Sequence, residues 1–269
     1  MATNQMLVRC SSLSKLRTKP QKAGETVAET TKKYLLREFA FWHHGRKEEQ
    51  SNKYIEKGHA RENDSLDLIS RKIKRVLVKN TVRLSDSYIT GEVDAFECIG
   101  IDPELWNVTR ATDTHDAKSS WSLITFLESK LSKNVDDEYY WQGVGYMRLT
   151  GAQRHHVHHC LVNGTPQAID KEKYYLKLAL GIIDDSIENE TYNEKAKQIE
   201  RNHIFDLGEF MNENPWYDLT HEPSEWSFDI PYHQRISTKT IERNEEEINW
   251  IPIGVTNARV YVANTFLNG

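Results

Sequence analysis

The sequence has few cysteines and no long apolar run. Its three cysteines, Cys10, Cys98 and Cys160, form no CxxC pair, which argues against a disulfide framework and against a four-thiolate zinc or iron–sulfur site. No apolar run approaches the roughly 18 residues that a membrane span needs, and the N-terminal Met-Ala-Thr-Asn-Gln-Met lacks the apolar segment of a secretory signal. We therefore expect a cytoplasmic protein without membrane contact.

An excess of positive charge is also missing. The 269 residues include 35 Lys and Arg and 40 Asp and Glu, which gives a net charge of -5. This balance argues against a surface coated in positive charge for long-range capture of nucleic acid, although it leaves room for a local basic groove. With 38% apolar and 28% charged residues, the composition is typical of a soluble globular protein with one substantial core.

Hydrophobic periodicity and turn residues divide the chain into elements. The first 24 residues are polar and basic, and we expect them to form a flexible arm ahead of a single domain over residues 25–269. Apolar residues spaced at threes and fours predict helices, and alternating or β-branched runs predict strands. The predicted helices cover residues 25–47, 52–78, 121–131 and 136–149, and the predicted strands cover residues 82–85, 88–96, 109–118 and 154–162.

This order of elements predicts an α/β (α+β) fold in which helices flank a central mixed β-sheet, with the core at about residues 50–165. A C-terminal elaboration follows, with a helix at 171–187, an acidic aromatic-rich stretch at 184–229, a strand at 235–242 and a helix at 245–266. The aromatic side chains of the acidic stretch can stack on nucleic-acid bases or pack in a core or interface, and packing is favoured. They are Trp216, Tyr217, Trp226 and Phe228.

Candidate chemistry concentrates on one short predicted strand. Because alternate side chains of a strand share a face, Asp116 and Lys118 point the same way, while Ala117 points to the opposite layer. Asp94 lies on the preceding strand, where it can pair with Asp116 to hold a hard divalent cation. Phosphodiester hydrolysis uses such an arrangement, with Lys118 orienting the attacking water or stabilising the pentacoordinate phosphate. Taken alone, however, an Asp-x-Lys triplet is better explained by an exposed ion pair.

Two predicted helices add companions to this triplet. Gln142 and Tyr146 are four residues apart and therefore share a helical face. Their helix contains two glycines, which weaken a helix by about 1 kcal/mol each unless something must approach closely. In the earlier helix, Gly58 could admit a phosphate or a metal, and Glu62 could supply a further acidic group.

Together these residues resemble a nuclease superfamily. The ordered set Gly58-x-x-x-Glu62, Gly91-Glu-Val-Asp94, Asp116-Ala-Lys118 and Gln142-x-x-x-Tyr146 is similar to the PD-(D/E)XK nucleases of the RecB-like branch, which have a restriction-endonuclease-like core. Within that branch the chain looks like the lambda-exonuclease/YqaJ type of phage recombination nuclease. The resemblance covers about residues 50–165.

The resemblance implies a role for each matching residue. Asp94 and Asp116 would be metal ligands, joined by the backbone carbonyl of Ala117, and Glu62 would bind the metal directly or through water. Lys118 would serve the nucleophile. The remaining two residues would support the site from the helix, namely Gln142 and Tyr146. The second acid is Asp where much of the branch has Glu, and its shorter side chain could shift the metal or require a bridging water.

The resemblance also implies a function. Iron–sulfur members of the branch hold their cluster with four cysteines, which this chain cannot supply. A Mg²⁺-dependent, or Mn²⁺-dependent, deoxyribonuclease that degrades duplex DNA ends 5′-to-3′ is the implied activity. Its implied partners are DNA and a single-strand annealing protein, with homo-oligomers known in the family. A phage enzyme of this kind would act in the cytoplasm of its bacterial host. The alternatives are a structure-specific or restriction-like endonuclease and an inactive DNA-binding protein.

Two other features have competing explanations. The basic segment at residues 71–83 is either a solvated helix end or a phosphate-contacting face. The run His155-His156-Val157-His158-His159 suggests zinc, but strand alternation puts His156 and His158 on the face opposite to the other two. We therefore interpret the histidine run as a strand of the sheet.

Overall fold

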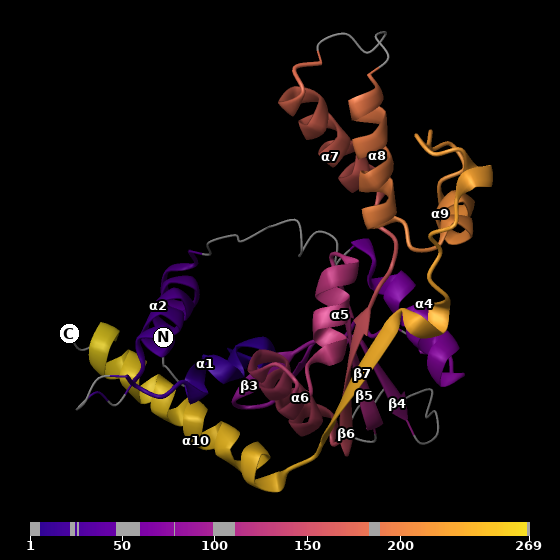
Figure 1. Ribbon diagram of the computed structural model, residues 1–269. Coiled ribbons are helices and arrows are strands. Elements are labelled where there is room, and N and C mark those ends of the chain that lie inside the picture. The colour runs from indigo at the N-terminus through magenta and orange to yellow at the C-terminus, as the bar shows by residue number, and fades with distance from the viewer. Residues whose placement is uncertain are drawn as a thin grey trace.

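The computed structural model describes residues 6–21, 25, 27–46, 60–77, 79–98, 111–182 and 189–267. At its centre is a four-stranded sheet in the order β4-β5-β6-β7 (Figure 1). β5 and β6 are parallel, whereas the two outer pairs are antiparallel. The sheet is therefore mixed, as the sequence predicts. Its strands are β4 (Ala95–Cys98), β5 (Ala111–Ser119), β6 (Arg154–Cys160) and β7 (Ile236–Glu242).

Helices cover both faces of this sheet. On one face, Val157 of β6 and Ile241 of β7 pack in the same core as Val144 of α6 (Asp137–Thr150). On the other face, Cys160 packs with Leu66 of α4 (Glu62–Ile73). Between the parallel strands the chain passes through α5 (Leu123–Leu131) and α6, which form the crossover that a parallel pair requires.

The N-terminal residues are part of the core, so the predicted flexible arm is wrong for residues 6–17. Val8 and Leu13 are at most 1% exposed. β1 (Val8–Arg9) pairs with β3 (Ile89–Gly91), which also pairs with β2 (Leu84–Ser85), and a 3-10 turn (Cys10–Ser12) and α1 (Leu13–Arg17) follow. The basic side chains are not simply solvated: Arg17 stacks 4.8 Å from the ring of Trp141 and 4.6 Å from that of Trp250.

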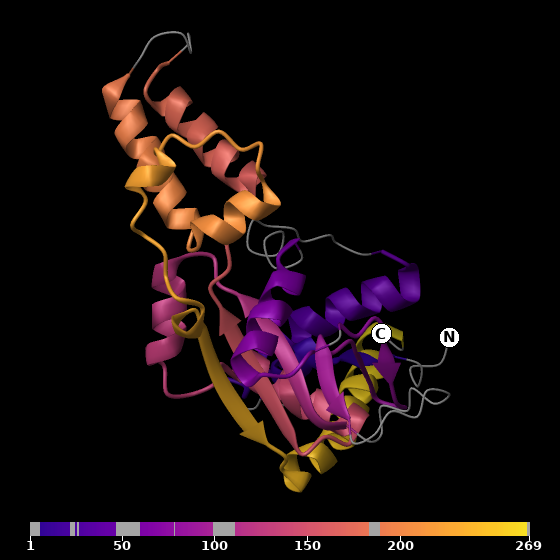
Figure 2. The same ribbon diagram turned by 90° about the vertical axis from the view of Figure 1, so that its right-hand side faces the viewer.

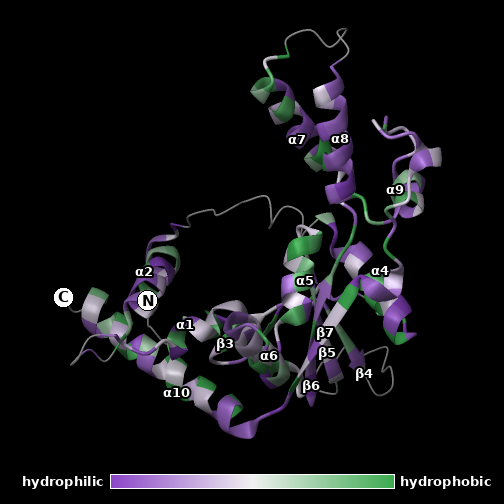
Figure 3. Ribbon diagram, in the orientation of Figure 1, coloured by the Kyte–Doolittle hydropathy of each residue, from purple (hydrophilic) through white to green (hydrophobic). Residues whose placement is uncertain are grey.

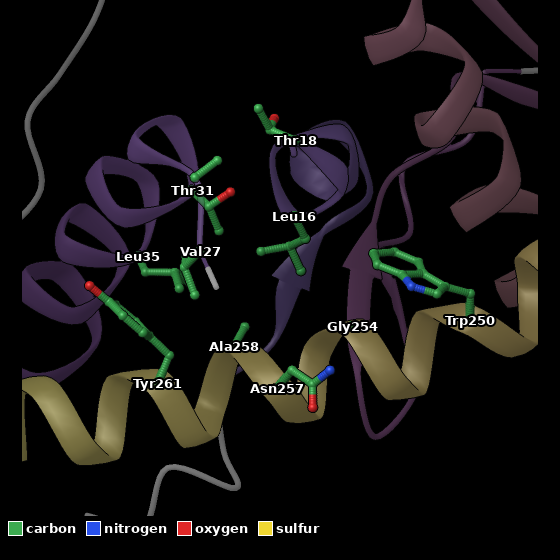
Figure 4. A pocket seen from close by; sticks show the side chains of 11 residues that line it. Leu16, Thr18, Val27, Thr31, Leu35, Trp250, Gly254, Asn257, Ala258 and Tyr261 are labelled. Atoms are coloured by element: carbon green, nitrogen blue, oxygen red, sulfur yellow. The ribbon is translucent and has the colours of Figure 1, made fainter. Parts of the chain in front are cut away.

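Two further helices close the outer side of the larger core. They are α2 (Glu29–His44) and α10 (Glu245–Val262), the latter continued by a π-helical turn (Ala263–Leu267). A pocket of about 240 Å³ lies between α1, α2 and α10 (Figure 4). Its walls combine apolar side chains, among them Leu16, Leu35 and Trp250, with polar groups of Thr31 and Asn257. The pocket contains none of the candidate site residues.

Within the predicted core at 50–165, one helix and one strand differ clearly from the structure. The helix predicted at 52–78 ends at Ile73, where Lys74 adopts a left-handed conformation with φ 57° that terminates α4. Its predicted beginning, including Gly58, lies outside the described residues. The strand predicted at 88–96 is two strands of different sheets, β3 and β4. The break arises because Asn80 occupies the backbone carbonyls between the two strands. Its side-chain amide donates a hydrogen bond to the carbonyl of Val93, and its backbone N–H donates one to the carbonyl of Asp94.

The C-terminal elaboration begins with a helical arm that projects from the sheet (Figures 1 and 2). It consists of α7 (Pro166–Ala179), α8 (Glu190–His203) and α9 (Leu207–Glu213). α7 starts five residues before the predicted helix, because Thr165 caps it and Pro166 fits its first turn. The sequence analysis did not predict the helix α8. Hydrophilic residues predominate along it (Figure 3). No described helix is long and apolar enough to span a membrane.

The arm has its own small core, which accounts for part of the aromatic-rich stretch. Tyr217 is buried with Phe210 and Ile204, and Trp226 packs against the same cluster. Trp216, in contrast, is 65% exposed. Packing in a core is therefore confirmed for Tyr217 and Trp226, whereas Trp216 lies outside this core.

The two glycines of α6 allow close contacts with the rest of the core. A Cβ atom at Gly143 would lie 2.4 Å from Cδ2 of His155, and one at Gly145 would lie 2.8 Å from Cδ1 of Leu13. Both distances are far below van der Waals contact. The expectation that something approaches this helix closely is confirmed.

Gly143→Ala should destabilise the protein by about 1–3 kcal/mol, because the buried His155 ring cannot move away from the added methyl group. Chemical denaturation would measure this change. Alanine is normally the better helix former, so a loss of stability would identify the clash. Gly208→Ala in α9 is the control, since its Cβ would meet only Asp206 Oδ1 at 3.5 Å. Equal stability of both variants would contradict the tight packing.

Candidate active site

The C-terminal half of β5 carries the acid and the lysine of the predicted site. Asp116 is 1% exposed, and its Oδ2 lies 2.5 Å from Nζ of the half-buried Lys118. The two residues stand opposite Val157 and His159 of β6, on the face that α6 covers. The predicted common face of Asp116 and Lys118 is therefore observed. The ion pair is sheltered from water rather than exposed at a sheet edge.

Asp94 reaches this pair from the segment between β3 and β4. The β4–β5 ladder ends where Ala95 pairs with His115, so the next part of the β5 edge is open. Asp94 Oδ2 accepts a 2.7 Å hydrogen bond from the backbone N–H of Ala117 at this edge. In a strand, the N–H and C=O of one residue point to the same edge. The Ala117 carbonyl therefore lies on the side from which Asp94 approaches.

The electrostatics of the site reflect closely spaced carboxylates. Burial, followed by the negative charge of Asp116, raises the pKa of Asp94 to about 8, although Lys118 and the Ala117 N–H act in the opposite direction. Burial alone would lower the pKa of Lys118, but the charges of Asp116 and Asp94 outweigh it and raise that pKa. The lysine therefore stays charged, while Asp94 is held protonated near neutral pH.

A chain of hydrogen bonds fixes the lysine from the helix side. Lys118 Nζ donates to Gln142 Oε1 at 3.5 Å, and Gln142 Nε2 donates to the hydroxyl of Tyr146 at 2.8 Å. That hydroxyl donates in turn to the carbonyl of Glu92, also at 2.8 Å. The chain thus ends in the same segment that carries Asp94, so α6 supports both sides of the site.

Glu62 lies at the edge of this group. Its carboxylate forms an ion pair with Lys79 at 3.2 Å, and its charge contributes to the raised pKa of Asp94. Lys79 forms a β-bridge with Ala95, next to Asp94. The structure therefore places Glu62 beside the other acids, but with a lysine as its immediate partner.

The oxygen atoms of the site suit a hard cation. Asp116 Oδ2 is buried and has no assigned hydrogen-bond partner among the described residues, so its charge is met by the Lys118 ammonium at 2.5 Å alone. Such an oxygen can be satisfied by a divalent ion. Within the described ranges, no three His, Cys, Asp or Glu side chains are already grouped closely enough to hold a metal. Lysines 79 and 118 instead neutralise the nearby carboxylates.

Two further residues lie at the site that the sequence analysis did not identify as site residues. The ring of Tyr139 lies 4.8 Å below Lys118 Nζ, which is a cation–π distance. Its position three residues before Gln142, on the same helical face, was the available signal. His155 lies under the site, bonded to the Thr114 hydroxyl at 2.8 Å, and burial lowers its pKa to about 3.

His156 and His158 form a separate row on the face of the sheet opposite to His155 and His159. His158 bonds to His115 and to Thr238 at 2.9 Å each, and His156 bonds to Asp113 at 2.9 Å. All lie in the β5–β6–β7 ladders. The interpretation of the run as a strand is confirmed.

The basic segment at 71–83 is partly neutralised by acidic side chains. Four of its cations each contact an acidic side chain: Arg71 with Glu209, Arg75 with Glu97, Lys79 with Glu62, and Arg83 with Glu92. Binding of DNA phosphates here would require these pairs to open.

Solved structures with the same fold come from exonucleases. The chain is similar to a phage related exonuclease from Haemophilus somnus 129PT, with 22% identity, a TM-score of 0.63, and coverage of 98% of this chain and 96% of that one. It is also similar to the alkaline exonuclease LHK-Exo from Laribacter hongkongensis, with 12% identity, a TM-score of 0.56, and coverage of 97% and 90%. A structure of LHK-Exo in complex with dAMP matches with 13% identity, a TM-score of 0.55, and coverage of 98% and 95%.

No protein-family model and no curated protein sequence matches the chain. The structural likenesses therefore establish the fold. They confirm the predicted α/β architecture with a mixed sheet, and they confirm at the level of fold the resemblance to phage-type exonucleases.

Asp94→Asn should stabilise the metal-free protein at pH 8 by about 1 kcal/mol or more. The pKa of Asp94 rises from near 3.8 in the unfolded chain to about 8 in the folded protein. Between these values the folded state keeps a proton that the unfolded state releases, so stability falls as the pH rises. Asparagine removes this penalty and can still accept the Ala117 N–H. Denaturation in chelator at pH 4 and pH 8 would measure the difference.

Asp113→Asn, on β5, is the matched control. Although burial acts against its charge, hydrogen bonds from Arg154 and His156 lower the pKa of Asp113. Its carboxylate therefore adds stability above the unfolded pKa, and that stability is lost as the pH falls. Asparagine should destabilise the protein at pH 8. A destabilised Asp94→Asn variant at this pH would contradict the charge arrangement described above.

Proposed function

We propose that this protein is a metal-dependent DNA exonuclease. The proposal rests on the hydrogen bond that Asp94 accepts from the Ala117 N–H at the edge of β5, beside the buried Asp116–Lys118 pair. This arrangement occurs on a fold that is shared with exonucleases. We further propose that Mg²⁺ is the cofactor, with Mn²⁺ as a substitute, and that no iron–sulfur cluster takes part.

The ligands in this proposal are Asp94, Asp116 and the Ala117 carbonyl, with Glu62 binding directly or through water. Mg²⁺ bound there would generate hydroxide near neutral pH and neutralise charge on the leaving oxygen. Asp94 must lose its proton to serve as a ligand, and Glu62 must turn away from Lys79. Lys79 would then be free to face the DNA backbone.

Lys118 positions and stabilises the reacting groups in this mechanism. Its ammonium is held by Asp116, by Gln142 and over the ring of Tyr139. An ammonium fixed in this way can orient a water molecule and stabilise negative charge on the phosphate as the water oxygen attacks. Because its pKa is raised, it acts as a fixed charge and not as a general base.

Duplex DNA ends are the proposed substrate, and 5′-to-3′ digestion is the proposed polarity. Both rest on the motif resemblance to phage recombination nucleases. A role in recombination, a single-strand annealing protein as partner and a homo-oligomeric assembly belong to the same proposal.

Linear duplex DNA should be degraded in Mg²⁺, and closed circular DNA should remain intact. Chelator should stop the reaction. Label at one 5′ end or one 3′ end would show the polarity, since 5′-to-3′ digestion releases the 5′ label first. Nicking or cutting of circles would identify an endonuclease instead, and no reaction on either substrate would indicate an inactive DNA-binding protein.

Asp116→Ala and Lys118→Ala should each lower kcat on linear DNA by at least about 100-fold, because each removes a group that acts on the reacting phosphate. Circular dichroism would show that the variants are folded. Lys130→Ala, at an exposed position on α5, is the control and should retain activity. Full activity of either site variant would make the site assignment wrong.

A further inference from the structure

We propose that Arg61 is a positioning residue that fixes Glu62 for metal binding and links it to the helical arm. The inference rests on the proposed function, because Glu62 matters here as a metal ligand. Arg61 directly precedes Glu62 and forms the N-cap of α4, with φ -118° and ψ 15°. It belongs to none of the motifs that suggested the site.

The guanidinium of Arg61 joins three separate parts of the chain. Its Nη1 donates to Asp64 at 2.8 Å, in the first turn of α4, and to Glu213 at 2.7 Å, at the end of α9. Its Nη2 donates to the carbonyl of Gly164 at 2.9 Å, in the turn after β6. Arg61 is only 7% exposed. A buried guanidinium with these acceptors holds α4, the sheet and the arm in one arrangement.

The backbone of Arg61 is tied to the catalytic strand as well. Its carbonyl accepts the N–H of Ser65 at 3.0 Å, and the Ser65 hydroxyl is 2.9 Å from that of Ser119, the last residue of β5. The first turn of α4 is therefore held on one side by Arg61 and on the other by β5. Glu62 lies within this turn, so its backbone has little freedom.

A fixed backbone matters because the Glu62 carboxylate can bind either Lys79 or the proposed metal. In the metal-free fold it pairs with Lys79 at 3.2 Å, while its charge acts on Asp94. If the backbone is held, a change of side-chain torsion alone can move the carboxylate to a metal. If the first turn is loose, the ligand must also be ordered, which weakens binding.

Arg71 offers a matched comparison. It also joins α4 to α9, through a 2.7 Å ion pair with Glu209, but it lies in the last turn of α4, away from Glu62. Loss of either arginine removes a contact between the arm and α4. Only loss of Arg61 releases the turn that carries Glu62.

The test is Mn²⁺ binding to the metal-free, full-length protein by isothermal titration calorimetry. Arg61→Met should weaken binding by about 10-fold, as expected for loss of a group that orients a ligand. Glu213→Gln, which leaves Arg61 in place, should weaken binding in the same direction. Arg61→Lys should retain more affinity than the methionine variant. Arg71→Met should bind Mn²⁺ like the unmodified protein.

Two reference variants separate this proposal from the proposed function. Asp94→Asn and Glu62→Gln should both weaken Mn²⁺ binding. The metal site itself would be overturned if both variants bound Mn²⁺ as tightly as the unmodified protein, or if the unmodified protein bound no Mn²⁺. If these two variants bind weakly while Arg61→Met and Glu213→Gln bind like Arg71→Met, only the role of Arg61 is overturned. Thermal denaturation of each variant shows that it is folded. Glu213→Gln, at a half-exposed side chain, still tests the link if Arg61→Met does not fold.

Discussion

The candidate site depends on where the hydrogen-bonded ladder between β4 and β5 stops. The last pair is Ala95 with His115, and two residues later the N–H of Ala117 is bonded to a side chain, that of Asp94. A longer ladder would use this edge for strand pairing and would leave no place for a carboxylate or a metal. The early end is produced by Asn80, whose contacts with Val93 and Asp94 turn the chain before β4 begins.

The other parts of the site are arranged around this open edge. α6 reaches it through Gln142 and Tyr146, and the glycines of that helix bring it close enough to the sheet to do so. α4 reaches it from the opposite face through Glu62. The site therefore lies where two layers of helices meet one strand end. Its acids come from three separate segments of the chain, namely α4, the segment before β4, and β5.

The sequence predicted the local features of the site and missed the tertiary ones. The common face of Asp116 and Lys118 follows from strand alternation, and that of Gln142 and Tyr146 follows from helical spacing. The division of the 88–96 segment into two strands depends on Asn80, which no periodic pattern reveals. The N-terminal segment was misjudged because its cations obscured Val8 and Leu13. α8 is strongly polar, and of its buried residues only Ala196 is apolar, so the spacing of apolar residues does not reveal this helix.

The lysine partners of the acids affect how the chain can fold when no metal ion is bound. Buried carboxylates held close together would normally repel one another and oppose folding. Here an ammonium group stands beside Asp116 and another beside Glu62, while Asp94 keeps a proton. The fold thus carries its own removable counter-charges. Such a chain can fold without a bound ion, and under the proposed function a metal would enter or leave as an exchange of cations without unfolding the site.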